Sequence, residues 1–149
     1  MKQYTADKIR NVAIVGHGGA GKSMLVEHML YTAGAIDRVG TIEAGNTQSD
    51  YDPLEIRRKI SLGATVLPLE WHDHKINVFD VPGYPDFIGQ TLCALRGVDL
   101  AVVVINAHTG IAVNTRRVYQ EAEKRGLGRV IVVNKMDDEN ADYGALVSS

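Results

Sequence analysis

Apolar residues along this chain fall into short continuous or alternating runs, separated by segments with helical spacing. The runs lie near residues 11–16, 64–71, 75–80, 100–106 and 129–134. Their length and their polar or glycine-rich borders predict strands. Apolar residues at helical spacing predict helices near residues 22–33, 87–96 and 113–125. Alternating strands and helices of this kind predict an α/β fold built on a doubly wound sheet.

Two of the predicted strands are joined by a very short polar connection. Asp73 and His74 separate two alternating runs, which is typical of a hairpin. The sheet is therefore expected to be mostly parallel with one antiparallel edge. In such sheets ligands bind at the carboxyl ends of the strands.

The segment from Gly34 to about Leu62 is long, polar and only weakly periodic. A connection of this length inside a compact domain is usually functional or disordered. The alternative is a surface loop without a ligand-dependent role.

Composition narrows the class of protein. The 149 residues are enough for one domain, and 45% hydrophobic with 23% charged residues is ordinary for a globular protein. A net charge of −2 provides no broad positive field, so direct DNA binding is not expected. The longest apolar run, Leu100 to Asn106, is too short to span a membrane, and the first residues contain no signal-peptide core. The single cysteine, Cys93, excludes a disulfide framework, fits a cytoplasmic location and is expected in the core.

The first candidate site is a glycine-rich loop between a predicted strand and a predicted helix. Residues 16–23 read G-H-G-G-A-G-K-S and match G-x-x-x-x-G-K-[ST], a loop that binds nucleotide phosphates. The backbone N–H groups of the loop and the helix N-terminus form an anion site. Lys22 is expected on the β- and γ-phosphates, and the Ser23 hydroxyl on Mg²⁺. The expected phosphate-binding residues are His17, Gly18, Gly19, Ala20, Gly21, Lys22 and Ser23. The alternative is a tight glycine turn that binds nothing.

The second candidate site follows the last predicted strand. Residues 134–137 read N-K-M-D. The carboxylate of Asp137 can accept from both N1–H and N2–H₂ of guanine, a donor pair that adenine lacks. Asn134 would hold the loop and the other edge of the base, while the Lys135 stem would lie along the purine ring. A polar turn after a strand is the alternative.

The third candidate site ends the strand near residues 75–80. Asp80 is followed by Pro82 and Gly83. An acidic residue at this end can hold Mg²⁺, usually through water. Gly83 would let its backbone N–H approach the γ-phosphate closely. The alternative for Asp80 is a turn residue or helix cap.

These motifs, in this order, resemble a translational GTPase, specifically the N-terminal G domain of elongation factor G. The resemblance runs from about Ile9 to Tyr143. It rests on residues 11–17, 21–23, 49–55 (S-D-Y-D-P-L-E), 80–83 with 86–87, and 134–137. The glycine pair at 18–19 and Tyr84 most resemble the divergent second elongation factor G found in many bacteria.

The resemblance implies a P-loop NTPase (G-domain) fold that binds GTP or GDP with Mg²⁺ and hydrolyses GTP. It implies a first switch at about residues 35–63, ordered by the γ-phosphate and Mg²⁺, and a second switch at about 80–96. It also implies that the ribosome is a partner of the longer parent protein, and that the parent is cytoplasmic and not membrane-bound.

The sequence departs from the family at three places. Tyr84 stands where most relatives have a histidine that positions the attacking water. Free phenols ionise only near about pH 10, so tyrosine is no general base at neutrality, although it can orient water as a neutral group. Ser61 stands where the family has a threonine whose hydroxyl closes the Mg²⁺ site, and we expect Ser61 to take that role. Only twelve residues follow Asp137, so we expect a domain truncated before its last strand and helix.

Two functions from different classes remain open. The first is a GTPase in which Lys22, Gly83 and Tyr84 serve the hydrolytic step, with Ser23, Ser61 and Asp80 around Mg²⁺. The second is a GTP-binding switch module with little hydrolysis, which Tyr84 favours. A kinase or ATPase with the same phosphate loop is disfavoured by the motif at 134–137.

Overall fold

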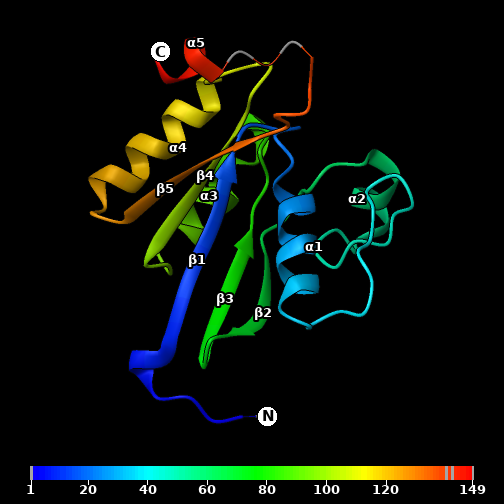
Figure 1. Ribbon diagram of the computed structural model, residues 1–149, viewed down its shortest axis with the longest axis vertical. Helices are drawn as coiled ribbons and strands as arrows, with labels where there is room; N and C mark the ends of the chain where they lie inside the picture. The colour runs from blue at the N-terminus through cyan, green and yellow to red at the C-terminus, as the bar shows by residue number, and fades with distance from the viewer. Residues whose placement is uncertain (1, 140, 142, 149) are drawn as a thin grey trace.

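The computed structural model describes residues 2–139, 141 and 143–148, and its centre is a five-stranded sheet (Figure 1). The strands are β1 (Ile9–Gly16), β2 (Thr65–Trp71), β3 (His74–Asp80), β4 (Leu100–Asn106) and β5 (Gly128–Asn134). The α-helices are α1 (Lys22–Thr32), α2 (Pro53–Arg58), α3 (Ile88–Ala94), α4 (Val113–Lys124) and α5 (Tyr143–Val147). Two 3-10 helices, η1 (Ala6–Lys8) and η2 (Pro85–Phe87), precede β1 and α3.

The order of the five described strands is β2-β3-β1-β4-β5; β2 and β3 pair antiparallel, and the other three pairs are parallel. The predicted α/β fold with a mostly parallel sheet and one antiparallel edge is confirmed. Register places Ile14 beside Asp80, Gly16 beside Val104, and Asn106 beside Asn134. The parallel strands therefore end together, and the segments that follow them meet at one edge of the sheet.

Alternation along β1 divides the core between the two faces of the sheet. Val12 and Ile14 face α1, where they pack with Val26 and Leu30. Ala13 and its neighbours on β4 face the opposite side, covered by α3 and α4 (Figure 1). The central strand is thus buried on both faces, as parallel sheets require.

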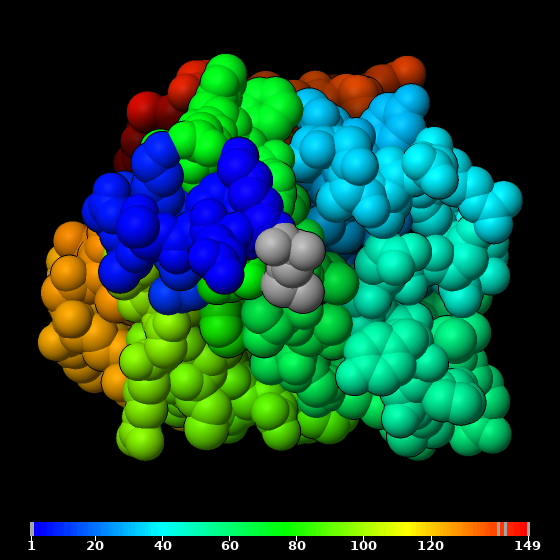
Figure 2. Space-filling model, turned by 90° about the horizontal axis from the view of Figure 1, so that it is seen from below, coloured from blue at the N-terminus to red at the C-terminus, as the bar shows by residue number. Residues whose placement is uncertain are grey.

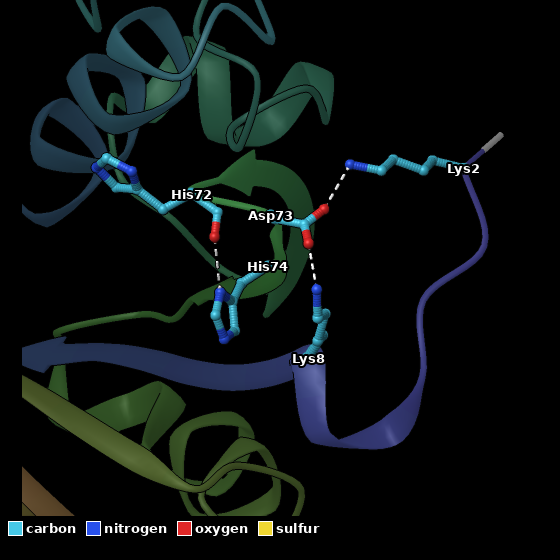
Figure 3. Close-up of polar contacts among 5 residues, drawn as sticks. All are labelled: Lys2, Lys8, His72, Asp73 and His74. Carbon is cyan, nitrogen blue, oxygen red and sulfur yellow. Dashed lines mark hydrogen bonds and ion pairs between the residues drawn. The ribbon is translucent and has the colours of Figure 1, made fainter.

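The N-terminal segment is tied to the β2–β3 hairpin (Figure 3), at the end of the sheet opposite to these strand ends (Figure 1). Figure 2 views the molecule from this end. Lys2 Nζ lies 2.8 Å from one carboxylate oxygen of Asp73, and Lys8 Nζ contacts the other. Hydrogen bonds from Lys2 and Lys8 lower the pKa of Asp73 to about 2. His72 and Asp73 both have positive φ, 43° and 60°, as a two-residue hairpin turn requires.

The long segment after α1 contains a helix that the sequence pattern did not predict. The Asp52 side chain caps α2 by accepting from Leu54 N at 2.7 Å. Glu55 bonds back to Asp52 N at 3.2 Å, which completes a capping box, and Pro53 begins the helix. Six residues are too few to show helical periodicity, so only this cap could have revealed α2.

The expectation that Cys93 lies in the core was wrong, because its side chain is exposed. In α3 the buried positions are Thr91 and Ala94, followed by Leu95. Helical geometry therefore places residue 93 on the opposite side of the helix.

No helix in the described part of the chain has the length and apolar character that crossing a membrane requires.

Candidate functional site

A cavity of about 350 Å³ opens where β1 and β3 end. The long segment 34–62 contributes residues on either side of α2 to its lining, namely Ile42, Glu43, Asp50, Lys59, Ile60 and Ser61. Most of the predicted site residues line it, namely Gly18, Gly19, Gly21, Lys22, Ser23, Ser61, Gly83, Tyr84 and Lys135. Three separate motifs are thereby brought to one cavity.

The floor of this cavity is the loop between β1 and α1. Gly21 has φ 92°, in the left-handed region, and any Cβ there would collide with the Asn134 side chain. Helix α1 begins at Lys22, so the N–H groups of its first turn have no partner within the helix. The loop and helix end form a site for an anion.

Lys22 is buried at the base of the loop, with 6% of its surface exposed. Its Nζ donates to the His17 carbonyl at 3.1 Å. Burial lowers the pKa of Lys22, and the nearby Asp80 and Asp50 partly oppose this. A buried ammonium whose hydrogen-bond partner is a neutral carbonyl gains from a nearby anion.

His17 contributes its main chain to this arrangement. Its side-chain Nδ1 is buried and, among the described residues, has no hydrogen-bond partner.

Asp80, the last residue of β3, is only 1% exposed and is not among the residues that line the cavity, but it lies close to Ser23 and Lys22, which do. Burial raises the pKa of its carboxyl to about 6, partly opposed by the nearby hydroxyls of Ser23 and Ser49 and by Lys22. Neither oxygen of Asp80 has a hydrogen-bond partner among the residues described. Burying a carboxylate without a partner costs free energy, and a bound cation or a hydrogen-bond donor would lower that cost.

Two hydroxyls complete an all-oxygen corner next to Asp80. Ser23 Oγ and Ser61 Oγ lie 3.3 Å apart, which brings the predicted Ser61 to the start of α1. Oxygen donors of this kind suit Mg²⁺, which is held by a few protein ligands together with phosphate and water. The residues present therefore fit that ion.

Asp50 is a further carboxylate at the cavity that sequence reasoning did not single out. Its side chain is buried on the cavity wall. Burial raises the pKa of Asp50, and the Ser61 hydroxyl and Lys22 oppose the shift. In the sequence it lies within the S-D-Y-D-P-L-E stretch, where no periodicity distinguishes it from its neighbours.

Two buried glutamates hold the segment 34–62 in place. Glu27 on α1 accepts from Gly40 N at 3.0 Å and also from Gln48 N. Glu55 on α2 accepts from Leu62 N at 2.8 Å and Gly63 N at 3.1 Å. Sequence reasoning missed both, because a single acidic residue in a helix normally indicates its solvent-exposed face.

The turn after β3 is packed on the phosphate loop and anchored from behind. Asn114 Nδ2 on α4 donates to the Gly83 carbonyl at 2.7 Å. Thr91 Oγ1 on α3 donates to the Pro82 carbonyl at 3.0 Å. A Cβ at Gly83 would meet Lys22 Nζ and the main chain at Gly18, so only glycine fits there.

The N-K-M-D stretch borders the same loop. Asn134 Nδ2 donates to the Ala20 carbonyl at 2.9 Å, which links β5 to the phosphate loop. Lys135 has φ 59° and lines the cavity. Asp137 is exposed two residues further along and is not among the residues that line the cavity.

Comparison with known proteins gives concordant matches. The family described as "Elongation factor Tu GTP binding domain" matches residues 7–149. The chain is 37% identical over 147 residues to mitochondrial ribosome-releasing factor 2 of Candida dubliniensis, covering 99% of this chain and 18% of that protein. It is 38% identical over 135 residues to an elongation factor G-like protein of Mycobacterium tuberculosis, covering 91% of this chain and 19% of that protein.

A solved structure from Thermus thermophilus superposes with a TM-score of 0.90 at 41% identity. The superposition covers 95% of this chain and 21% of that one. The chain thus spans about a fifth of the length of the relatives it matches.

Proposed function

Because this chain belongs to the translational GTPases, as an elongation factor Tu-type GTP-binding domain, we propose that it binds GTP and GDP with Mg²⁺ and hydrolyses GTP. The observation that carries the proposal is that buried Lys22 and Ser23 line one cavity, with the buried Asp80 close to both of them. Burying two ionisable groups without a direct ion pair is costly. A polyphosphate with its cation would supply both missing partners.

The phosphates would lie on the loop from His17 to Ser23, with Lys22 at the β- and γ-phosphates. The open N–H groups of the α1 N-terminus support this placement. Mg²⁺, when bound, would be held by Ser23 and Ser61, with Asp80 acting directly or through water, and would neutralise phosphate charge.

Guanine would be recognised by Asp137, with Lys135 along the ring and Asn134 holding the base loop against Ala20. The hydrogen bond from Asn134 to Ala20 supports a pocket in which base and phosphates are bound by adjoining loops. Adenine would leave the Asp137 carboxylate unpaired, which gives the discrimination.

Hydrolysis would proceed by in-line attack of water on the γ-phosphate. Lys22 stabilises charge on the β,γ-bridging oxygen, and the Gly83 N–H binds a γ-phosphate oxygen. Tyr84 orients the water as a neutral hydrogen-bonding group. Its position on the wall of the same cavity supports that role.

In its parent protein this domain would act with the ribosome. The names of the relatives, ribosome-releasing factor 2 and elongation factor G-like protein, support that partner. The segment 34–62 and the turn after Asp80 would serve as the two switches, since both contact the loop that holds the phosphates.

A second candidate is a GTP-binding switch that barely hydrolyses. Tyr84 favours this candidate, because it stands where most relatives have the histidine that positions the attacking water, and a neutral phenol is no general base. The Tyr84→His variant separates the two: a large gain in turnover supports the switch, and no gain, with or without ribosomes, contradicts it.

The proposal is tested by single-turnover release of phosphate from GTP, with and without ribosomes. Lys22→Met is expected to abolish turnover and weaken GTP binding at least about tenfold, since it removes a charge-assisted contact. Lys124→Met, an exposed lysine on α4, removes the same charge far from the cavity. Equal effects of the two variants would contradict the proposed role of Lys22.

A further inference from the structure

Gly18, in the phosphate loop, has no backbone reason to be glycine. Its φ lies outside the left-handed region, whereas Gly19 and Gly21 beside it have φ of 77° and 92°. Alanine would therefore be compatible with the main-chain conformation at 18. The reason for glycine must lie in what a side chain would meet.

A side chain at 18 would meet the ring of Tyr84. An ideal Cβ at Gly18 would lie 2.8 Å from both Cε2 and Cζ of Tyr84, and 3.1 Å from Cδ2. The two 2.8 Å distances are shorter than non-bonded carbon atoms approach one another in a packed protein. The phenol ring therefore occupies the space that a methyl group at residue 18 would need.

The main chain on either side of Tyr84 is fixed, so the ring position depends on Gly18. The Gly83 carbonyl accepts from Asn114, and the Tyr84 carbonyl accepts from Phe87 N at 3.1 Å. With the backbone held, the remaining freedom is rotation of the side chain. Tyr84 is 40% exposed, so outward rotation to solvent is open to it.

We propose that Gly18 is a positioning residue for Tyr84, which keeps the phenol ring against the phosphate loop for the hydrolytic step. This inference rests on the proposed function, because it assigns the ring a part in that reaction. The ring and Gly18 both line the cavity with Lys22 and Ser61, where the γ-phosphate would lie. A glycine and a tyrosine thus form a size-matched pair across two separate motifs.

In the hydrolysis that this pair would serve, no proton is transferred to the protein. The oxygen of water bonds to the γ-phosphorus, and the bond from that phosphorus to the bridging oxygen breaks. The bonding electrons leave with GDP, and the water protons end on inorganic phosphate and solvent. The Tyr84 hydroxyl accepts from the water and donates to a neighbouring acceptor, so it remains a neutral phenol throughout.

The test compares Gly18→Ala, Tyr84→Phe and the double variant in the full chain. Gly97→Ala is the matched control, because it also adds one methyl at an ordinary φ and meets only Ala94 O at 3.8 Å. Two quantities are measured for each protein: the dissociation constant for GDP, and the single-turnover rate of GTP hydrolysis. Ring placement is followed by ¹⁹F NMR of protein labelled with 3-fluorotyrosine, with the Tyr84 resonance assigned by its loss in Tyr84→Phe.

At saturating GTP, Gly18→Ala is expected to shift the Tyr84 resonance and to slow single-turnover hydrolysis roughly tenfold to hundredfold, a loss larger than any change in its dissociation constant for GDP. The double variant should be no slower than the slower of the two single variants, because both changes remove the same contribution. In a Tyr84→His background Gly18→Ala should cost less, since the smaller ring leaves room for the methyl group.

An unmoved Tyr84 resonance in Gly18→Ala would overturn the size-matched pair. A shifted Tyr84 resonance with an unchanged rate of hydrolysis would overturn the role of Gly18 in hydrolysis. So would a double variant whose loss of rate equals the product of the two single losses. Wild-type protein that binds no GTP would instead overturn the proposed function and this role with it. If the wild-type protein hydrolyses GTP and Gly18→Ala does so at the same rate, only the role of Gly18 is overturned and the proposed function stands.

Discussion

Glu27 provides the sharpest test of how the segment 34–62 is held. Its carboxylate, 0% exposed, accepts from Gly40 N at 3.0 Å and from Gln48 N, two points at either end of one loop. Glu27→Gln keeps the shape and the helix propensity but replaces one acceptor oxygen with an NH₂ donor. One loop N–H then faces another donor, and the other loses its charged acceptor.

The magnitude follows from these two bonds. Hydrogen bonds to charged groups contribute about 1.5–3 kcal/mol, and leaving a buried donor unsatisfied costs about 1–3 kcal/mol. The variant should therefore destabilise the docked loop by roughly 2–3 kcal/mol. If the loop undocks by itself, the loss appears as faster local exchange; if it unfolds with the domain, Tm falls by about 4–12 °C.

Hydrogen exchange of the Gly40 and Gln48 amides measures the local part, and thermal unfolding measures the global part. A loss of about 2–3 kcal/mol corresponds to roughly 30- to 150-fold faster exchange. Glu43→Gln is the matched control, because it makes the same chemical change at an exposed position in the same loop. The reasoning would be refuted if Glu27→Gln had the same amide exchange rates and the same Tm as Glu43→Gln.

Three further predictions concern other parts of the molecule. Lys8→Met should raise the pKa of Asp73 from about 2 towards its ordinary value, as followed by carboxyl NMR during an acid titration. Because the folded-state pKa is depressed, the stability from this pair is present above about pH 4 and lost as pH falls towards about 2; a pKa that stays low would contradict the pairing. Asp137→Asn should weaken GDP binding about tenfold or more in a fluorescence titration while leaving ATP binding as weak as before, since the charged acceptor of two guanine donors is lost; unchanged GDP affinity would exclude Asp137 as the guanine reader. Thr91→Val should lower the free energy of unfolding by about 1–3 kcal/mol in urea, because it leaves the Pro82 carbonyl buried without its donor, and an unchanged midpoint and slope would show that this bond adds nothing.

The strands and long helices could be predicted because their signal is periodic. The strand at residues 100–106 has the predicted bounds, and the others differ by one or two residues. Helix α4 was predicted at 113–125 and ends at Lys124. Burial of a helix or strand on one face, or of a central strand on both faces, imposes these patterns, so they can be read without tertiary information.

What escaped prediction depends on contacts between distant segments. Glu27 and Asp50 are buried acidic residues whose partners lie on other elements, so neither has a local sequence signal. Helix α2 is set by its cap rather than by periodicity. Cys93 was placed on the wrong side of α3, because an apolar stretch does not indicate which face is covered.

The central claim is that the cavity at the carboxyl ends of β1 and β3 binds guanine nucleotide. The direct measurement is titration of the chain with fluorescent GDP and GTP analogues in Mg²⁺, followed by competition with unlabelled nucleotides. The account predicts saturable binding that unlabelled GTP displaces and ATP does not. Failure to bind, or equal displacement by ATP, would contradict it.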